Sequence, residues 1–127
     1  MELGKLKIYS ISVDLSNQVW SEVITWDSFS RYTIGKQLVR AADSIAANIS
    51  EGYGRYHYKE EKQFLFYARG SLYETKTFLT IAFDRKLLSA DIYDQLISQI
   101  NILGPMINSF INTIGKINNP KIFPNDQ

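Results

Sequence analysis

Residues 37–55 read QLVRAADSIAANISEGYGR, and this stretch decides the fold. Its apolar residues recur every three or four positions, at Leu38, Ala41, Ile45 and Ile49. This spacing predicts one buried face of an α-helix, because a helix turns once in about 3.6 residues. We expect the helix to end near Gly52 and Gly54, because glycine readily adopts the left-handed conformation that often follows a helix.

Three further segments show the same helical spacing. They are residues 8–23, 58–85 and 89–114. Asp27 or Ser28 is suited to begin the helix that contains the quoted stretch, and Ser89 is suited to begin the last one, because their side chains can accept hydrogen bonds from free backbone amides. Four amphipathic segments with short connections predict an all-α fold, an antiparallel up-down four-helix bundle.

Size and composition limit the classes of protein to which the chain can belong. Its 127 residues suit one domain, which we expect to comprise a bundle at residues 1–117 and a flexible polar tail at residues 118–127. The absence of cysteine excludes disulfides, thiolate metal sites and cysteine nucleophiles. The sequence shows no signal peptide and no apolar run of about 20 residues, so we expect a cytoplasmic protein without membrane contact.

The charges are unevenly distributed along the chain. The net charge is only +1, from 14 basic and 13 acidic residues, whereas nucleic-acid-binding domains are usually strongly basic. Residues 31–86 nevertheless contain ten Lys and Arg residues against six Asp and Glu residues. We therefore expect any surface that faces an anionic partner to lie on the middle of the chain.

The same middle region resembles a known family. The quoted stretch is followed by FLFYARGSLYE at residues 64–74. The two blocks are similar to the family patterns Q-L-x-R-A-A-x-S-I-x-x-N-I-x-E-G-x-G-R and F-L-x-x-A-x-G-S-L-x-E. These patterns identify the bacterial four helix bundle proteins, also called 23S rRNA intervening-sequence proteins, and the resemblance covers residues 8–115. Glu61 departs from the family, which usually has an aromatic residue there, and it places a charge on the apolar side of its helix.

The resemblance implies a homo-oligomer, and specifically a pentamer. The family is related to the accessory variability determinant of diversity-generating retroelements, which forms a pentameric barrel and binds nucleic acid and a reverse transcriptase. The partners that the resemblance implies are therefore further copies of the chain, RNA or DNA, and a reverse transcriptase or another protein. Most members of the family have no established activity.

A polar row runs beside the apolar face of the helix that contains the quoted stretch. Its members are Gln37, Ser44, Asn48, Glu51 and Arg55. Polar groups at such a boundary need partners, because a buried unpaired group costs roughly 2 kcal/mol or more. The row fits a ligand or nucleic-acid site, or a hydrogen-bonded network that fixes helix register or a subunit contact. We favour the network, and we regard the first four members as candidate interface residues.

A second ridge lies about a third of a turn from the apolar face of the helix expected at residues 58–85. Its members are Lys62, Phe66, Arg69, Tyr73 and Lys76. Cations interleaved with aromatic rings can contact phosphates and stack bases, and the same residue types are enriched in protein interfaces. We favour a subunit interface that uses Phe66 and Tyr73, and we regard the three cations as candidate nucleic-acid contacts.

Three more cations complete the candidate nucleic-acid set. Arg55 and Lys59 flank Tyr56-His57-Tyr58 in the loop before a helix, whose N-terminus attracts anions. This cluster fits an RNA contact or a solvated loop, and we favour the solvated loop. Arg40 lies away from the apolar face of its helix and fits either a subunit interface or an anion contact.

The sequence does not support a catalytic or metal site. His57 is the only histidine, so a histidine-rich metal site is excluded and a Ser-His-Asp set has little support. The paired Glu-x-x-His motifs of di-iron bundles are missing. We therefore expect no cofactor, no metal and no enzyme activity. The expected function is that of a homo-oligomeric bundle that binds nucleic acid or a nucleoprotein partner. The alternative is a purely structural protein–protein interaction module.

Overall fold

The computed structural model describes Leu3 and residues 6–115, and the tail expected at residues 118–127 lies outside them. Within the described residues there are four long helices: α1 (Lys7–Val23), α3 (Lys36–Tyr53), α4 (Tyr58–Asp84) and α5 (Ala90–Thr113). A single turn, α2 (Ser28–Ser30), and a π-helical turn, η2 (Arg31–Gly35), lead from α1 into α3.

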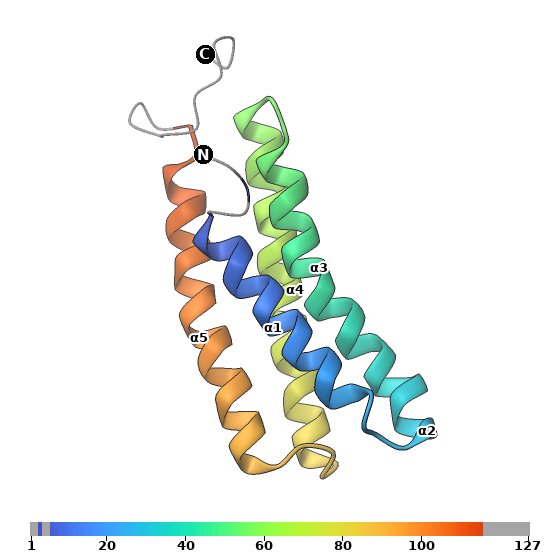
Figure 1. Cartoon of the computed structure of the whole chain (residues 1–127). Coiled ribbons are helices and arrows are strands. Elements are labelled where there is room, and N and C mark those ends of the chain that lie inside the picture. Colours follow the sequence, from blue (N-terminus) through green and yellow to red (C-terminus); the bar gives the residue numbers. More distant parts are fainter. Residues whose placement is uncertain (1–2, 4–5, 116–127) are drawn as a thin grey trace.

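The four long helices run alternately up and down (Figure 1). Helix α3 packs against α1 and α4, and α5 packs against α4 and α1, so each long helix contacts the next around the bundle. The expected all-α bundle is therefore confirmed. None of the helices in the described part of the chain is long and apolar enough to cross a membrane.

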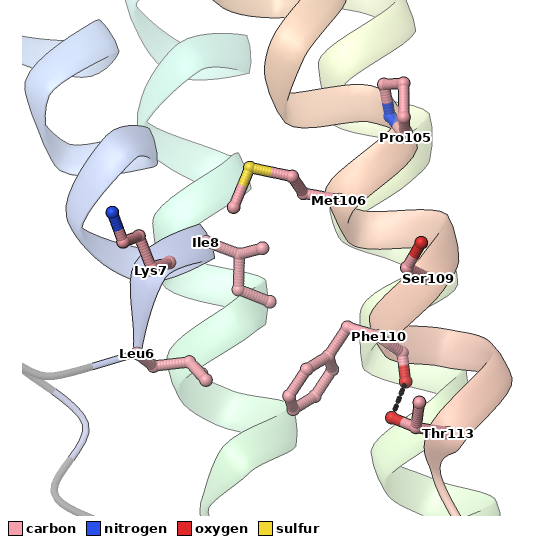
Figure 2. Close-up of a pocket in the computed structure, with 8 residues that line it drawn as sticks. All are labelled: Leu6, Lys7, Ile8, Pro105, Met106, Ser109, Phe110 and Thr113. Carbon is pink, nitrogen blue, oxygen red and sulfur yellow. Dashed lines mark hydrogen bonds between the residues drawn. The ribbon is translucent and has the colours of Figure 1, made fainter.

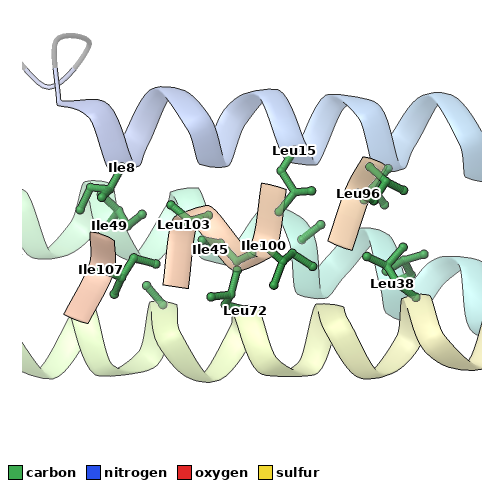
Figure 3. Close-up of a cluster of buried hydrophobic side chains, with 14 of the residues drawn as sticks. Ile8, Leu15, Leu38, Ile45, Ile49, Leu72, Leu96, Ile100, Leu103 and Ile107 are labelled. Atoms are coloured by element: carbon green, nitrogen blue, oxygen red, sulfur yellow. The ribbon is translucent and has the colours of Figure 1, made fainter. Parts of the chain in front are cut away.

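The core is formed by the apolar face of each helix, as the spacing predicted. Figure 3 shows side chains from all four long helices meeting along the bundle axis. Fully buried examples are Leu15, Leu38, Ile45, Leu72, Leu103 and Ile107. Burial of each such side chain contributes about 1.5–3 kcal/mol, so this face dominates the stability of the fold.

Two helix starts carry the side-chain caps that the sequence predicted. An Asp27 carboxylate oxygen accepts a hydrogen bond from the backbone N–H of Ser30 at 3.1 Å. The Ser89 hydroxyl accepts one from the backbone N–H of Ile92 at 3.2 Å. Each bond satisfies an amide that has no partner within its own helix.

The Asp27 cap makes the stability of the bundle depend on pH. Hydrogen bonds from the side chain and then the backbone of Ser30 lower the pKa of Asp27 below its ordinary value of 3.8. A lowered pKa stabilises the fold above the ordinary value, and this stabilisation is lost as the pH falls through the folded-state pKa.

We expect Asp27→Asn, which keeps a capping oxygen but loses the charge, to be less stable than the wild type at pH 7. The difference should shrink as the pH falls below about 3.8. Urea unfolding at pH 7 and at acidic pH measures both values. A difference that stays the same at both pH values would show that the charge of Asp27 does not contribute.

Gly52 has a different role from the one that we expected. Helix α3 ends at Tyr53, as predicted. The predicted left-handed glycine cap is wrong, however, because Gly54 has φ −79°. A Cβ atom on Gly52 would lie 2.8 Å from Leu65 Cδ2 and 3.1 Å from the carbonyl oxygen of Glu61. Gly52 therefore allows α3 and α4 to pack closely at this end of the bundle. Glu61 is fully buried there, on the apolar side where the sequence placed it.

Candidate nucleic-acid interface

The ridge predicted on residues 62–76 lies on α4, along its border with α5. We call it the α4 ridge, and its members are Lys62, Phe66, Arg69, Tyr73 and Lys76. Phe66 is 40% exposed and Tyr73 is 59% exposed. Lys76 is exposed as well, whereas Lys62 and Arg69 are half-buried. The structure therefore presents two aromatic rings and three cations on one side of a single helix.

Arg69 is held in place at the centre of this ridge. Its guanidinium donates a hydrogen bond to Asn108 Oδ1 on α5 at 3.0 Å. The guanidinium carbon also lies 5.0 Å from the centre of the Phe66 ring, within the range of a cation–π interaction. Two contacts therefore orient the charge and the neighbouring ring together. Sequence spacing does not reveal the contact with Asn108, because this contact depends on how α4 and α5 pack.

The surroundings of the ridge favour an anionic partner. Glu74 is the only acidic residue of α4 between Lys62 and Lys76. At about 100° per residue it projects roughly a third of a turn away from the ridge. On the α5 side the neighbour is the amide of Asn108, which carries no charge. The field of the three cations is therefore opposed only weakly by nearby acids.

The other three candidate cations are not members of the α4 ridge, although Lys59 lies beside it. Arg55 forms an ion pair with Glu51 at 2.9 Å, and its guanidinium carbon lies 4.7 Å from the centre of the Phe64 ring. At 100° per residue, Phe64 and Phe66 point to opposite flanks of α4, so Arg55 belongs to the α3 side. Lys59 is exposed in the first turn of α4, and at 100° per residue it lies about 60° from Lys62, beside the start of the ridge. Arg40 is exposed on α3, beside α1. The six cations thus form three separate groups.

The polar row on α3 makes hydrogen bonds within its own helix. The Asn48 side-chain amide donates to the Ser44 carbonyl oxygen at 2.8 Å, and Arg55 pairs with Glu51. Ser44 and Asn48 are half-buried, whereas Gln37 and Glu51 are exposed. The Asn48–Ser44 bond lies within α3, and the Glu51–Arg55 pair joins α3 to a residue just after its end, so neither interaction fixes the register of α3 against another helix. A subunit contact through Gln37, Ser44, Asn48 and Glu51 stays a prediction.

An apolar groove between α1 and α3 was not anticipated from the sequence. It has a volume of about 700 Å³. Trp20 of α1, Ile24 just after α1 and Tyr32 of η2 line it, and they are 55%, 47% and 69% exposed. The signal for this groove was present, because Trp20 and Ile24 are four residues apart and lie off the core face of α1. We call it the α1–α3 groove.

A smaller apolar pocket of about 430 Å³ lies between the start of α1 and the end of α5. Figure 2 shows Leu6, Ile8, Met106 and Phe110 converging on it, with Lys7 directed away. It lies at the end of the bundle where the described residues stop.

His57 is exposed at the same end of the bundle, with its ring in edge contact with Tyr56 at 4.9 Å between centroids. Among residue 3 and residues 6–115, no three His, Asp or Glu side chains are placed to share a metal ion.

Comparison with known proteins identifies the family. A family model described as 23S rRNA-intervening sequence protein matches residues 4–109. The chain belongs to this family. No protein of curated function matches the chain.

A crystal structure from Bacteroides thetaiotaomicron VPI-5482 is similar in fold. It is described as a protein of unknown function from the S23 ribosomal protein family. The match has a TM-score of 0.75 and 17% sequence identity, and it covers 84% of this chain and 99% of the other. At this level of identity the similarity establishes the fold alone.

The polar row occupies specified positions of the family patterns, whereas three members of the α4 ridge occupy open ones. All five members of the polar row occupy positions that the first family pattern specifies. Phe66, Arg69 and Tyr73 instead occupy open positions of the second pattern, between specified residues such as Leu65 and Leu72 that are buried in the core. The polar row therefore belongs to the residues that carry the resemblance, whereas Phe66, Arg69 and Tyr73 do not.

Proposed function

We propose that this member of the 23S rRNA intervening-sequence family is a non-catalytic RNA-binding bundle, and that the α4 ridge contacts the RNA. One observation carries the proposal: the exposed rings of Phe66 and Tyr73 alternate with three cations along one side of a helix. Proteins that bind single-stranded nucleic acid combine cations that follow the phosphates with rings that stack on the bases.

The dimensions of the ridge support this proposal. Phe66 and Tyr73 are seven residues apart, which corresponds to about 10 Å along a helix. The cations are separated by the same interval, from Lys62 to Arg69 and from Arg69 to Lys76. Arg69 is oriented before RNA arrives by its contacts with Asn108 and Phe66, so little side-chain freedom is lost on binding. The description of the family, which names a 23S rRNA, makes RNA the first polymer to test.

The proposal predicts RNA binding that depends on salt. Three cations that each neutralise one phosphate give a slope of about −2 in a plot of log affinity against log salt for a single strand. The affinity should therefore fall roughly 20-fold between 50 and 200 mM KCl. Fluorescence anisotropy with a labelled 12-nucleotide RNA, and with the matching DNA, measures this dependence. Absence of binding to both polymers at 50 mM KCl would refute the proposal.

The aromatic rings can be tested separately from the charges. We expect Phe66→Ala/Tyr73→Ala to bind RNA about 30-fold more weakly or worse, because each stacked base contributes about 1–3 kcal/mol. Its salt slope should stay close to that of the wild type, because the cations remain. Tyr67→Ala is the matched control, since Tyr67 is similarly exposed on α4 but lies off the ridge. Equal losses in Tyr67→Ala and the double variant would contradict specific stacking.

A structural interaction module is the second candidate, because the same exposed rings suit a subunit contact. This candidate predicts self-association, and a pentamer would have five times the 14.6 kDa mass of one chain. Light scattering of the purified protein measures that mass. A monomeric mass would remove the support for self-assembly and would leave the RNA proposal standing.

A further inference from the structure

The α1–α3 groove is a second exposed surface, separate from the α4 ridge. Its exposed rim includes Trp20 on α1, Ile24 just after α1 and Tyr32 on η2. Its less exposed lining, which we call the floor, includes Val23 of α1 and Val39 of α3. Large exposed apolar side chains that gather in one place usually mark an interaction site.

Gly35 explains why this groove exists. A Cβ atom at Gly35 would lie 2.7 Å from Val23 Cγ1 and 3.1 Å from the Ser30 carbonyl oxygen. The glycine therefore lets η2 close against the end of α1. With η2 held there, the side chain of Tyr32 projects into solvent beside Trp20 instead of joining the core.

The charges around the groove are mainly positive. Arg31, Lys36 and Arg40 line it. Arg31 lies over the Tyr32 ring, 5.4 Å from its centre, and donates a hydrogen bond to the Ile24 carbonyl oxygen at 3.4 Å. Among the described residues, Asp43 is the only acid that lines the groove, and its carboxylate accepts a hydrogen bond from the Ser16 hydroxyl. An acidic partner therefore meets three cations and one acid that is already engaged.

We propose that the α1–α3 groove binds an amphipathic helix, with acidic residues flanking its apolar face, from a different protein. The lining residues extend along the chain from Arg31 to Ala47, which corresponds to roughly 20–24 Å, or four turns of a partner helix. Helices bind in such grooves by placing apolar residues three, four and seven positions apart into the floor. The basic rim then pairs with the acids on either side.

The charges and the floor distinguish this partner from two others. A second copy of the chain that docked through its α4 ridge or its own groove would be a poorer match, because both surfaces are lined with cations. Either surface would bring like charges together across the contact. RNA matches the rim but not the floor, because charged phosphates lose their hydration against Val23 and Val39.

A displayed library of 16-residue helical peptides tests the proposal. In each peptide, apolar residues are fixed at positions i, i+4 and i+7, and the flanking positions are randomised. Selection on the full chain should enrich Asp and Glu at the flanks. The selected peptides should bind Trp20→Ala/Tyr32→Ala about 30-fold more weakly, because the rings are the expected anchors. Selection on Lys36→Glu/Arg40→Glu should instead enrich Lys and Arg. Phe66→Ala/Tyr73→Ala, with the groove intact, is the control and should bind the selected peptides like the wild type.

Three results would overturn the proposal. The first is a selection without acidic enrichment, or with peptides that bind Trp20→Ala/Tyr32→Ala as well as the wild type. The second is an oligomer, measured by light scattering, that dissociates in that variant, since the occupant would then be a second copy. The third is loss of RNA binding in the same variant, since the groove would then belong to the RNA surface. Circular dichroism should show that each variant is folded. We expect Trp20→Ala/Tyr32→Ala to fold because both side chains are exposed.

Discussion

Replacing Leu103 with alanine should lower the free energy of unfolding by about 3–5 kcal/mol, whereas replacing the adjacent Ile102 should change it by less than about 0.5 kcal/mol. Both residues are on α5, but Leu103 is 0% exposed and Ile102 is 58% exposed. Leu103 lies in the middle of the core, among side chains from the other helices (Figure 3). Truncation there removes buried apolar surface and leaves a cavity, whereas truncation at Ile102 exposes surface that already contacts water.

Urea unfolding measures both changes, and thermal unfolding should show a fall in Tm of roughly 10–20 °C for Leu103→Ala. Ile102→Ala is a close control because it deletes a side chain of the same size from the same helix. A loss below about 1 kcal/mol for Leu103→Ala would mean that α5 does not pack on the bundle as described. A large loss for Ile102→Ala would mean that the outer face of α5 is covered in solution.

The fold could be predicted because burial in a helical bundle leaves a local, periodic pattern. Leu103 and Ile107, four residues apart, point to the same side of α5 whatever the rest of the chain does. The caps at Asp27 and Ser89 are likewise local, since each side chain reaches an amide three residues ahead. Features that depend on neighbours in sequence were therefore found correctly.

Features that depend on how helices pack were missed. The position of Gly52 in the sequence suggested a helix cap, but its role is to let Leu65 approach from α4. The spacing of one helix does not reveal which residue of another helix it meets. The same limit applies to Arg69, whose place on the ridge was predicted but whose bond to Asn108 was not.

The two candidate surfaces differ in the same way, because one lies on a single helix and the other is formed by several elements. The α4 ridge was found because all its members belong to one helix. The α1–α3 groove needs residues from α1, η2 and α3 to come together, and Gly35 decides how closely they do so. Trp20 and Ile24 were visible in the sequence as a second apolar pair on α1, but only the structure places Tyr32 beside them.

Reversing two charges of the α4 ridge, in Arg69→Glu/Lys76→Glu, should weaken RNA binding on the order of 100-fold. Loss of two charge-assisted contacts, each worth about 1.5–3 kcal/mol, accounts for a change of this size. The salt slope should approach zero, because the single remaining ridge cation, Lys62, faces two new acids. Lys36→Glu/Arg40→Glu is the matched control, because it changes the net charge equally but lies in the α1–α3 groove.

Anisotropy and light scattering on the same two variants separate the proposed functions. If the ridge variant keeps its solution mass but loses RNA, the ridge is the RNA contact surface. If the mass of an assembled protein falls instead, the ridge is a subunit interface, because a reversed Arg69 and Lys76 would disturb the contact that Phe66 and Tyr73 form. Equal loss of RNA binding in the groove control would mean that the protein attracts RNA through its overall charge. At a net charge of +1 that attraction is weak, so a specific effect of the ridge should be plainly visible.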